Sequence, residues 1–386
     1  MKRSVDRILT THTGSLPRPP DLAELVFARE DGQADPARVA ARVRDAVADV
    51  VIRQADAGVD VLNDGELSKV GYSNYVKDRL SGFDGESARP GPSDIPDFPG
   101  FMERRERERG RGFQYMRTPA CTGPIALRDR EAVRTDVANL RAALEDVEAE
   151  EVFMSAASPG VIALFFGNQH YPTRDAYLAA IADAMRDEYE AIVEAGFVLQ
   201  LDCPDLAMGR HIQFGAEDLA AFQREAERNV EALNHATTGI DPDRMRLHLC
   251  WGNYEGPHHR DVELRDILDI VLRARPNGIS LEACNPRHEH EWAVFEDVRL
   301  PEGKLLIPGV VDSTNNYIEH PDLVAQRLVR YARVVGRENV LAGTDCGFGT
   351  FAGVSNVDPD IVWAKFEAMA EGARRASEQL GSPARA

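Results

Sequence analysis

Along this chain, short runs of apolar residues alternate with longer stretches in which apolar side chains recur at helical spacing. A short apolar run is typical of a buried strand, whereas recurrence at every third or fourth position is typical of an amphipathic helix. The runs that predict strands are residues 7–12, 59–64, 152–157, 197–202, 245–250, 278–282, 305–310 and 340–344. The patterns that predict helices are residues 36–57, 173–195, 215–235, 263–274 and 321–335.

Strands that alternate with helices in this way predict an α/β fold, a (β/α)8 TIM barrel formed by residues 1–386 as a single catalytic domain. A doubly wound sheet is the main rival. It is disfavoured because no predicted strand is followed by the Gly-x-Gly-x-x-Gly loop of its dinucleotide-binding members. In a barrel the active site lies at the carboxyl ends of the strands, so polar residues at those positions are the candidates for chemistry.

Two segments interrupt the pattern. Residues 84–118, after the second predicted strand, combine a Pro- and Gly-rich stretch with a charge-dense one, MERRERERGRG. Neither can bury a core, so we expect an insertion, either a solvated loop with a short charged helix or a lid over the barrel mouth. Residues 120–127 are expected to add a strand or hairpin. Residues 375–386 are expected to form a flexible tail.

Composition limits the class of partner. The formal net charge of −19 argues against binding to nucleic acid or to an anionic membrane, because both require basic patches. No apolar stretch approaches the roughly 18–20 residues of a membrane span, and the basic amino terminus lacks the apolar region of a signal peptide. Five cysteines, at positions 121, 203, 250, 284 and 346, fit reduced thiols or metal ligands better than disulfides. These features predict a cytoplasmic protein. They leave its oligomeric state open, with a homo-oligomer as one alternative.

The predicted strand ends carry polar and metal-binding side chains. They include Ser15, Asp64, Glu66, Asp202, His248, Cys250, Glu282, Cys284, Asp312, Asp345 and Cys346.

Among these residues, His248 and Cys250 form a His-x-Cys motif. Residues i and i+2 of a strand share a face, so both can point at one metal ion. Zinc takes imidazole, thiolate and carboxylate ligands. Cys346 and Glu282, at the ends of other strands, are the expected partners, and Cys284 competes with Glu282 because strand alternation puts both on one face.

In sequence order, these motifs resemble the catalytic half of cobalamin-independent methionine synthase and its shorter single-barrel relatives. The matching stretches are residues 10–18 (TTHTGSLPR), 64–66 (DGE) with Tyr75 and 80–83 (LSGF), 199–202 (LQLD) with Pro204, 248–250 (HLC), Glu282, 308–310 (PGV) with Asp312, and 345–347 (DCG).

The resemblance implies a zinc-dependent transfer of an alkyl group to a thiol. By motif matching, the zinc ligands would be His248, Cys250, Glu282 and Cys346. Ser15, Glu66 and Asp202 match positions that hold the amino and carboxylate groups of homocysteine, and Glu66 and Asp202 are also candidate catalytic residues. The thiol would lose its proton on binding the metal and attack an electrophilic carbon. The partners implied are a small-molecule thiol and an alkyl donor.

The chain departs from the folate-using members in several places. Cys203-Pro204 replaces their Glu-Pro, and residues 309–316 lack their His after the Gly-Val-x-Asp turn. Their Trp after the third strand is replaced by Phe165 or Phe166, so Phe165 is the expected substrate contact. These departures favour a donor other than polyglutamyl methylfolate.

Two alternative activities remain. In the epoxyalkane:coenzyme M transferase subgroup, a zinc-bound thiolate opens an epoxide, and the resulting alkoxide needs a proton donor. The candidates for that donor include His170, Tyr171, His211 and His320. Arg210 or Arg287 would hold the sulfonate of coenzyme M. The alternative of another class is a metal-free barrel like uroporphyrinogen decarboxylase.

Overall fold

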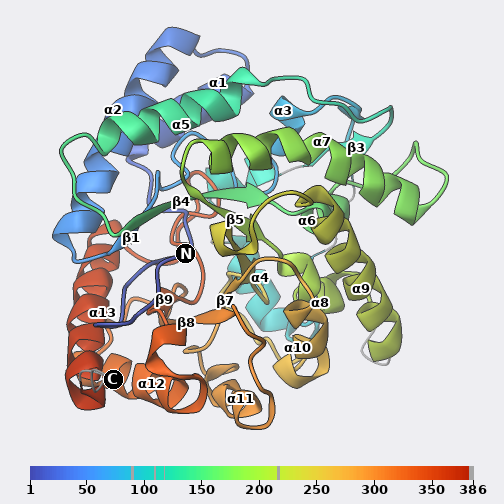
Figure 1. Ribbon diagram of the computed structural model, residues 1–386. Coiled ribbons are helices and arrows are strands. Elements are labelled where there is room, and N and C mark those ends of the chain that lie inside the picture. The colour runs from blue at the N-terminus through green and yellow to red at the C-terminus, as the bar shows by residue number, and fades with distance from the viewer. Residues whose placement is uncertain (88–90, 108–109, 117, 215–217, 382–386) are drawn as a thin grey trace.

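The computed structural model describes residues 1–87, 91–107, 110–116, 118–214 and 218–381. Seven parallel strands form one curled sheet in the order β1-β4-β5-β6-β7-β8-β9 (Figure 1). Their bounds are β1 Val61–Leu62, β4 Glu151–Ala157, β5 Val198–Asp202, β6 Met245–Leu249, β7 Gly278–Leu281, β8 Leu305–Val311 and β9 Gly343–Thr344. The sequence-predicted strands from residue 59 onward each correspond to one of these seven, so the α/β barrel prediction is confirmed.

The segment around Thr10 closes the barrel between β9 and β1. Thr11 N–H donates to Ala342 O at 2.8 Å, and Val61 N–H donates to Thr10 O at 3.0 Å. The predicted strand 7–12 is reduced to a single bridge at Thr10. The reason is local: the Thr10 N–H donates to the Asp60 carboxylate at 2.8 Å, so a side chain takes the place of a strand carbonyl.

Helices surround the sheet, and their amphipathic patterns bury apolar faces against it (Figure 1). The bounds of the main helices are α1 Pro20–Glu30, α2 Pro36–Asp56, α5 Glu131–Ala143, α6 Pro159–Phe165, α7 Arg174–Glu194, α8 Gly209–Gln213, α9 Leu219–Ala236, α10 Leu264–Leu272, α12 Pro321–Val335 and α13 Pro359–Leu380. The shorter helices α3 and α11 are Val76–Arg79 and Val294–Asp297. The five sequence-predicted helices are confirmed. The predicted start of α9 at residues 215–217 lies outside the described residues, and Asp218 caps the helix by accepting from Ala221 N–H at 3.0 Å.

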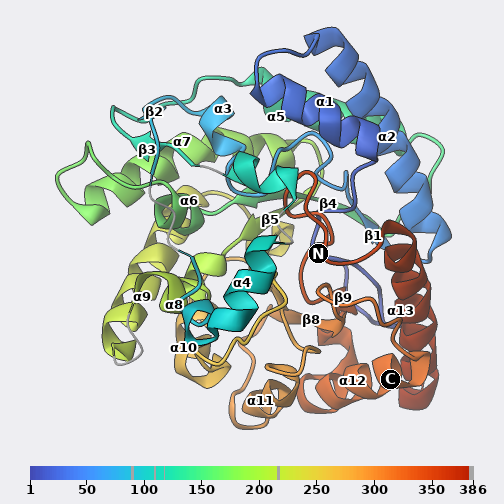
Figure 2. The same ribbon diagram turned by 180° about the vertical axis from the view of Figure 1, so that it is seen from behind.

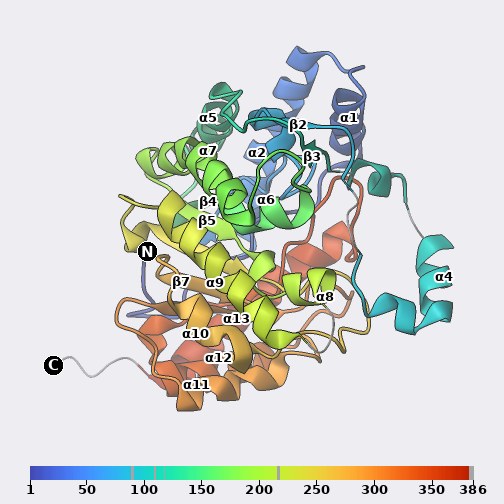
Figure 3. The ribbon, with the colours of Figure 1, turned by 90° about the vertical axis from the view of Figure 1, so that its right-hand side faces the viewer.

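The insertion at residues 84–118 is tied to the barrel at its base. β2 (Phe83–Asp84) pairs antiparallel with β3 (Ala120–Cys121), so of the strand or hairpin predicted at residues 120–127 the structure has a short strand, whose partner lies before the insertion. Its described helical parts are η1 (Ile95–Asp97), α4 (Pro99–Arg107) and η2 (Arg111–Met116). Figures 2 and 3 show α4 standing off one end of the barrel.

The tail prediction is wrong for residues 375–380, which continue α13. They are ordered because the last turns of the helix pack on the amino-terminal segment. Ala376 is fully buried, and Ile8 N–H donates to Ser377 Oγ at 2.9 Å. Residues 382–386 lie outside the described residues. Within the described part of the chain, no helix has both the length and the apolar character that a membrane span requires.

Candidate active site

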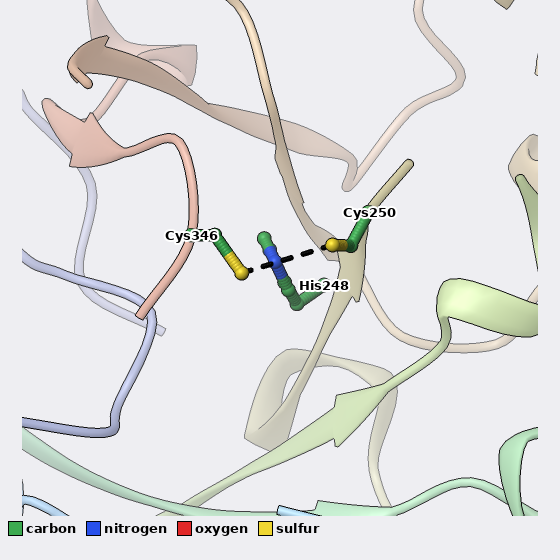
Figure 4. Close-up of side chains that lie close together, drawn as sticks. All are labelled: His248, Cys250 and Cys346. Atoms are coloured by element: carbon green, nitrogen blue, oxygen red, sulfur yellow. Dashed lines mark hydrogen bonds between the residues drawn. The ribbon is translucent and has the colours of Figure 1, made fainter. Parts of the chain in front are cut away.

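Two cysteines and one histidine meet at the carboxyl ends of β6 and β9. His248 lies in β6, Cys250 directly follows it, and Cys346 lies two residues beyond β9. The Sγ atoms of Cys250 and Cys346 are 3.7 Å apart, and a ring nitrogen of His248 lies within 4.8 Å of both. Figure 4 shows the three side chains converging from these two strands. All three are buried.

The donor set fits a tetrahedral metal ion. Two sulfurs each about 2.3 Å from a tetrahedral zinc ion would be about 3.8 Å apart, close to the observed sulfur separation. His248 Nδ1 is 3.1 Å from Ser280 Oγ, while its Nε2 is buried and has no hydrogen-bond partner among the described residues. Metal-binding histidines commonly use one nitrogen for such a contact and the other for the ion.

Burial keeps these groups uncharged in the metal-free protein. It lowers the pKa of His248 to about 3, with the nearby Arg246 charge contributing, so the imidazole is neutral as a ligand must be. The contact with Cys346 and the burial of the site both raise the pKa of the Cys250 thiol. Metal binding at this site therefore requires loss of thiol protons.

Glu282 lies one residue past β7, but its carboxylate is held by its neighbours. Oε1 accepts from Trp251 N–H at 2.7 Å, and Oε2 accepts from Asn285 Nδ2 at 2.9 Å. Burial and the neighbouring Cys250 raise the pKa of Glu282 well above its usual range. Glu282 is thus beside the thiol cluster without belonging to it, and its coordination of a metal stays a prediction.

Cys284, the rival to Glu282, does not join the cluster of His248, Cys250 and Cys346. Its N–H donates to Asp345 Oδ1 at 3.0 Å, and its carbonyl accepts from Arg327 Nη2 at 3.2 Å.

Two buried carboxylates share a cavity with the thiols. Glu66 Oε1 accepts from Ser155 Oγ at 2.6 Å, while Glu66 Oε2 is buried and has no hydrogen-bond partner among the described residues. Asp202, the last residue of β5, accepts from Gln200 Nε2 at 2.9 Å. Burial and the nearby Glu66 charge raise the pKa of Asp202 well above its usual range. A cationic group bound between these carboxylates would relieve their repulsion.

The third predicted contact, Ser15, is packed against the loop that carries Cys346. Phe348 N–H donates to Ser15 O at 2.8 Å. A Cβ on residue 347 would overlap Ser15 Oγ, so the close approach requires Gly347.

The cavity that contains these groups has a volume of about 480 Å³. Ser15, Glu66, Asp202, His248, Cys250 and Cys346 all line it. The insertion supplies an outer wall through Glu86, Ser87, Gly91, Pro92, Arg105, Phe113 and Met116. The position of the insertion agrees with the predicted lid over the barrel mouth. That the insertion opens and closes stays a prediction.

Seven residues that were predicted as proton donors, substrate contacts or sulfonate ligands do not line this cavity. His211 is buried, with Nδ1 3.0 Å from Asp261 Oδ1, in a separate cluster. Phe165 is buried in α6, and Arg210 in α8 reaches Phe214 O at 3.4 Å. Arg287 is exposed, as are His170 and His320, and Tyr171 is also absent from the lining. Their proposed roles as proton donors, substrate contacts or sulfonate ligands gain no support from their positions.

Sequence reasoning missed Arg246, which is fully buried inside the barrel below the thiol cluster. Its guanidinium donates to Gln200 Oε1 at 2.8 Å and to Thr11 Oγ1 at 2.9 Å, and it lies 3.5 Å from the centre of the Phe153 ring. Gln200 in turn donates to Asp202, so the arginine supports one of the carboxylates indirectly. The spacing could have revealed it, because Arg246 and His248 are two residues apart in β6 and therefore point to the same face of the strand.

Comparison with known proteins gives a consistent family. The family model described as "Cobalamin-independent synthase, Catalytic domain" matches residues 164–358, about half of the chain. A methionine synthase of Saccharolobus solfataricus is 24% identical over 374 residues, covering 96% of this chain and 95% of that protein. A 5-methyltetrahydropteroyltriglutamate–homocysteine methyltransferase of Nitratidesulfovibrio vulgaris is 26% identical over 343 residues, covering 88% of this chain and 39% of that protein.

Among solved structures, a B12-independent methionine synthase from Shewanella sp. W3-18-1 in complex with selenomethionine superposes with a TM-score of 0.74. It is 19% identical, and the match covers 97% of this chain and 99% of that one, so the likeness supports the fold. The family model, the relatives and the fold agree with the motifs at the strand ends. This chain belongs to the family of the cobalamin-independent synthase catalytic domain.

Proposed function

We propose that this protein is a zinc-dependent S-methyltransferase that acts on homocysteine or a closely related amino thiol. One observation carries the proposal: the two sulfurs 3.7 Å apart and the orphaned His248 nitrogen line the same cavity as two buried carboxylates. Membership of the family, and the similarity to proteins named methionine synthase, support methyl transfer as the reaction.

His248, Cys250 and Cys346 would hold the metal, and Glu282 stands next to them as the candidate fourth ligand. Bound zinc would lower the pKa of a substrate thiol that enters its coordination sphere, giving a nucleophile at neutral pH. The protein's own contribution is to keep the imidazole neutral, to bury the site and to aim the thiol. Burial also excludes water, which could compete for the methyl group.

The carboxylates select the other end of the thiol substrate. Glu66 Oε2 lacks a hydrogen-bond partner among the described residues. The negative charges of Glu66 and Asp202 are close enough to repel each other. An ammonium group therefore suits the space between the two carboxylates. Arg105, on the insertion, is the sole cationic side chain among the described residues that line the cavity. A thiol with an amino group therefore fits the inner cavity better than coenzyme M, which carries a sulfonate and no amine.

The methyl donor would enter from the outer cavity. Besides the insertion, the barrel contributes the apolar side chains of Tyr72, Met208, Ile212, Phe351 and Val354 to the lining. The epoxide-opening alternative is less favoured, because its candidate proton donors lie outside the described lining. As the sequence suggested, we propose that the methyl donor is a molecule other than polyglutamyl methylfolate.

The test is a matrix of thiols and donors with zinc-loaded protein. The thiols are homocysteine, 4-mercaptobutyrate, which lacks the amino group, and coenzyme M. The donors are methylcobalamin, methylfolate and a small epoxide. We expect methylation of homocysteine, much weaker use of 4-mercaptobutyrate, and loss of activity when zinc is removed. Turnover of coenzyme M with the epoxide alone would overturn the proposal, and full methyl transfer after removal of the metal would overturn the zinc dependence.

A further inference from the structure

Asn253 connects the loops that follow β6, β8 and β9. Its Nδ2 donates to Gly347 O at 2.7 Å, and its Oδ1 accepts from Ser313 Oγ at 2.9 Å. Gly347 directly follows Cys346, and Asn253 comes three residues after Cys250. One side chain thus joins the two segments that carry the thiols.

The sheet itself does not make this connection. β6 and β9 are separated by β7 and β8 in the strand order, so no ladder hydrogen bond links their carboxyl ends. The separation of the two Sγ atoms therefore depends on the loops above the sheet. On the β6 side, Gly252 N–H donates to Cys250 Sγ at 3.2 Å, which ties the thiol to the turn that ends at Asn253.

On the β9 side, Gly347 has little freedom to move away. It packs against Ser15, and the next residue, Phe348, donates its N–H to Ser15 O at 2.8 Å. Ser313 fixes the orientation of the Asn253 amide from the third loop. The Asn253 side chain thereby cross-links the two loops, next to a longer contact in which Asn356 Nδ2 donates to the Asn253 backbone O at 3.3 Å.

Asn253 also lines the cavity, so direct contact with substrate is the rival role. Both of its terminal atoms, however, already have protein partners. A substrate group could use only the second N–H and the second lone pair of this amide, in an orientation that the 2.7 Å and 2.9 Å hydrogen bonds already fix. These contacts assign the side chain to the loops rather than to the ligand.

We propose that Asn253 is a positioning residue that holds the two thiol-bearing loops at metal-binding distance. The inference rests on the proposed function only in taking zinc as the metal. Orienting groups around metal ligands typically change affinity by about 10–100-fold when they are removed.

Two substitutions separate the contacts. Asn253→Asp keeps the size and the acceptor for Ser313 but replaces the donor to Gly347 O with an oxygen that repels it. Ser313→Ala removes only the bond that orients the amide. Asn234→Asp is the matched control: this asparagine also donates to a carbonyl, Arg273 O at 3.0 Å, and accepts from an N–H, that of Arg275 at 2.7 Å, but lies outside the cavity.

The readouts are zinc affinity by chelator competition, the thiolate-to-metal absorption of the cobalt(II) form, and the thermal stability of the metal-free protein. We expect Asn253→Asp to weaken zinc binding about 10–100-fold and to shift the cobalt spectrum. Ser313→Ala should have a smaller effect in the same direction. Asn234→Asp should change neither the zinc affinity nor the spectrum. Wild-type affinity and an unchanged spectrum in Asn253→Asp would overturn the inference. Absence of stoichiometric zinc from the wild type would instead overturn the proposed function. If Asn253→Asp does not fold, Ser313→Ala decides by the same two measurements.

Discussion

Replacing Cys346 by serine should remove one of three converging metal ligands while leaving the metal-free fold almost unchanged. Serine is nearly the same size, and its hydroxyl remains buried beside Cys250. Structural zinc sites in peptides bind with about 10–16 kcal/mol, so one ligand in four, with Glu282 counted as the fourth, accounts for about 2.5–4 kcal/mol. At about 1.4 kcal/mol per factor of ten, zinc should bind about 100–1,000-fold more weakly.

The measurement is the zinc dissociation constant by competition with a chromophoric chelator, together with zinc content after gel filtration. Cys284→Ser is the matched control, because it makes the same chemical change in a buried cysteine of a neighbouring loop. We expect it to keep wild-type affinity. Stoichiometric zinc with unchanged affinity in Cys346→Ser would refute the ligand assignment. A larger loss in Cys284→Ser would show that the cluster seen here is not the metal site.

Three further outcomes are expected. Glu66→Gln should raise the KM for homocysteine about 10–100-fold, since a charged hydrogen bond to the ammonium is lost; an equal rise for 4-mercaptobutyrate would contradict this role. Burial raises the pKa of Asp205 to about 7, whereas in the unfolded chain this carboxyl loses its proton above about pH 3.8. Between about pH 4 and 7 the native state therefore holds one more proton, and the free energy of unfolding falls as the pH rises. Asp205→Asn should therefore increase the free energy of unfolding by about 3–5 kcal/mol at pH 8 and little at pH 4, as urea denaturation would measure; equal effects at both pH values would exclude the mechanism. Arg79→Met should cost about 3–5 kcal/mol of unfolding free energy, because it leaves the buried carboxylates of Asp136 and Glu188, 2.5 and 3.0 Å from the guanidinium, without a cation. A change below about 1 kcal/mol in the same assay would mean that the carboxylates find other partners.

Much of the candidate site could be predicted from the sequence, because strand alternation is a local rule. His248 and Cys250 share a face of β6 by their spacing alone. The placement of Glu66, Asp202 and Cys346 beyond apolar runs indicated that they would meet at one end of a barrel. The structure brings all five to the lining of one cavity.

The loop and helix residues that were predicted from their side-chain chemistry alone do not lie at the cavity. His211 and Arg210 lie on a short helix after β5, and the direction of their side chains depends on packing with Asp261 and Phe214. Arg287 follows β7 but points to solvent. A polar residue in a loop has no periodic pattern that would fix its orientation, so its type alone cannot determine its contacts.

Local sequence pattern was enough to predict the alternation of strands and helices, the barrel, and the strand ends that carry thiols, imidazole and carboxylates. These follow from short-range periodicity and from the rule that parallel strands end at one face. The folded protein was needed to show that the sulfurs of Cys250 and Cys346 lie 3.7 Å apart, that Glu282 is held by Trp251 and Asn285, and that the insertion forms the outer wall. Those features depend on contacts between loops far apart in the chain, and such distances are fixed by packing rather than by any local pattern.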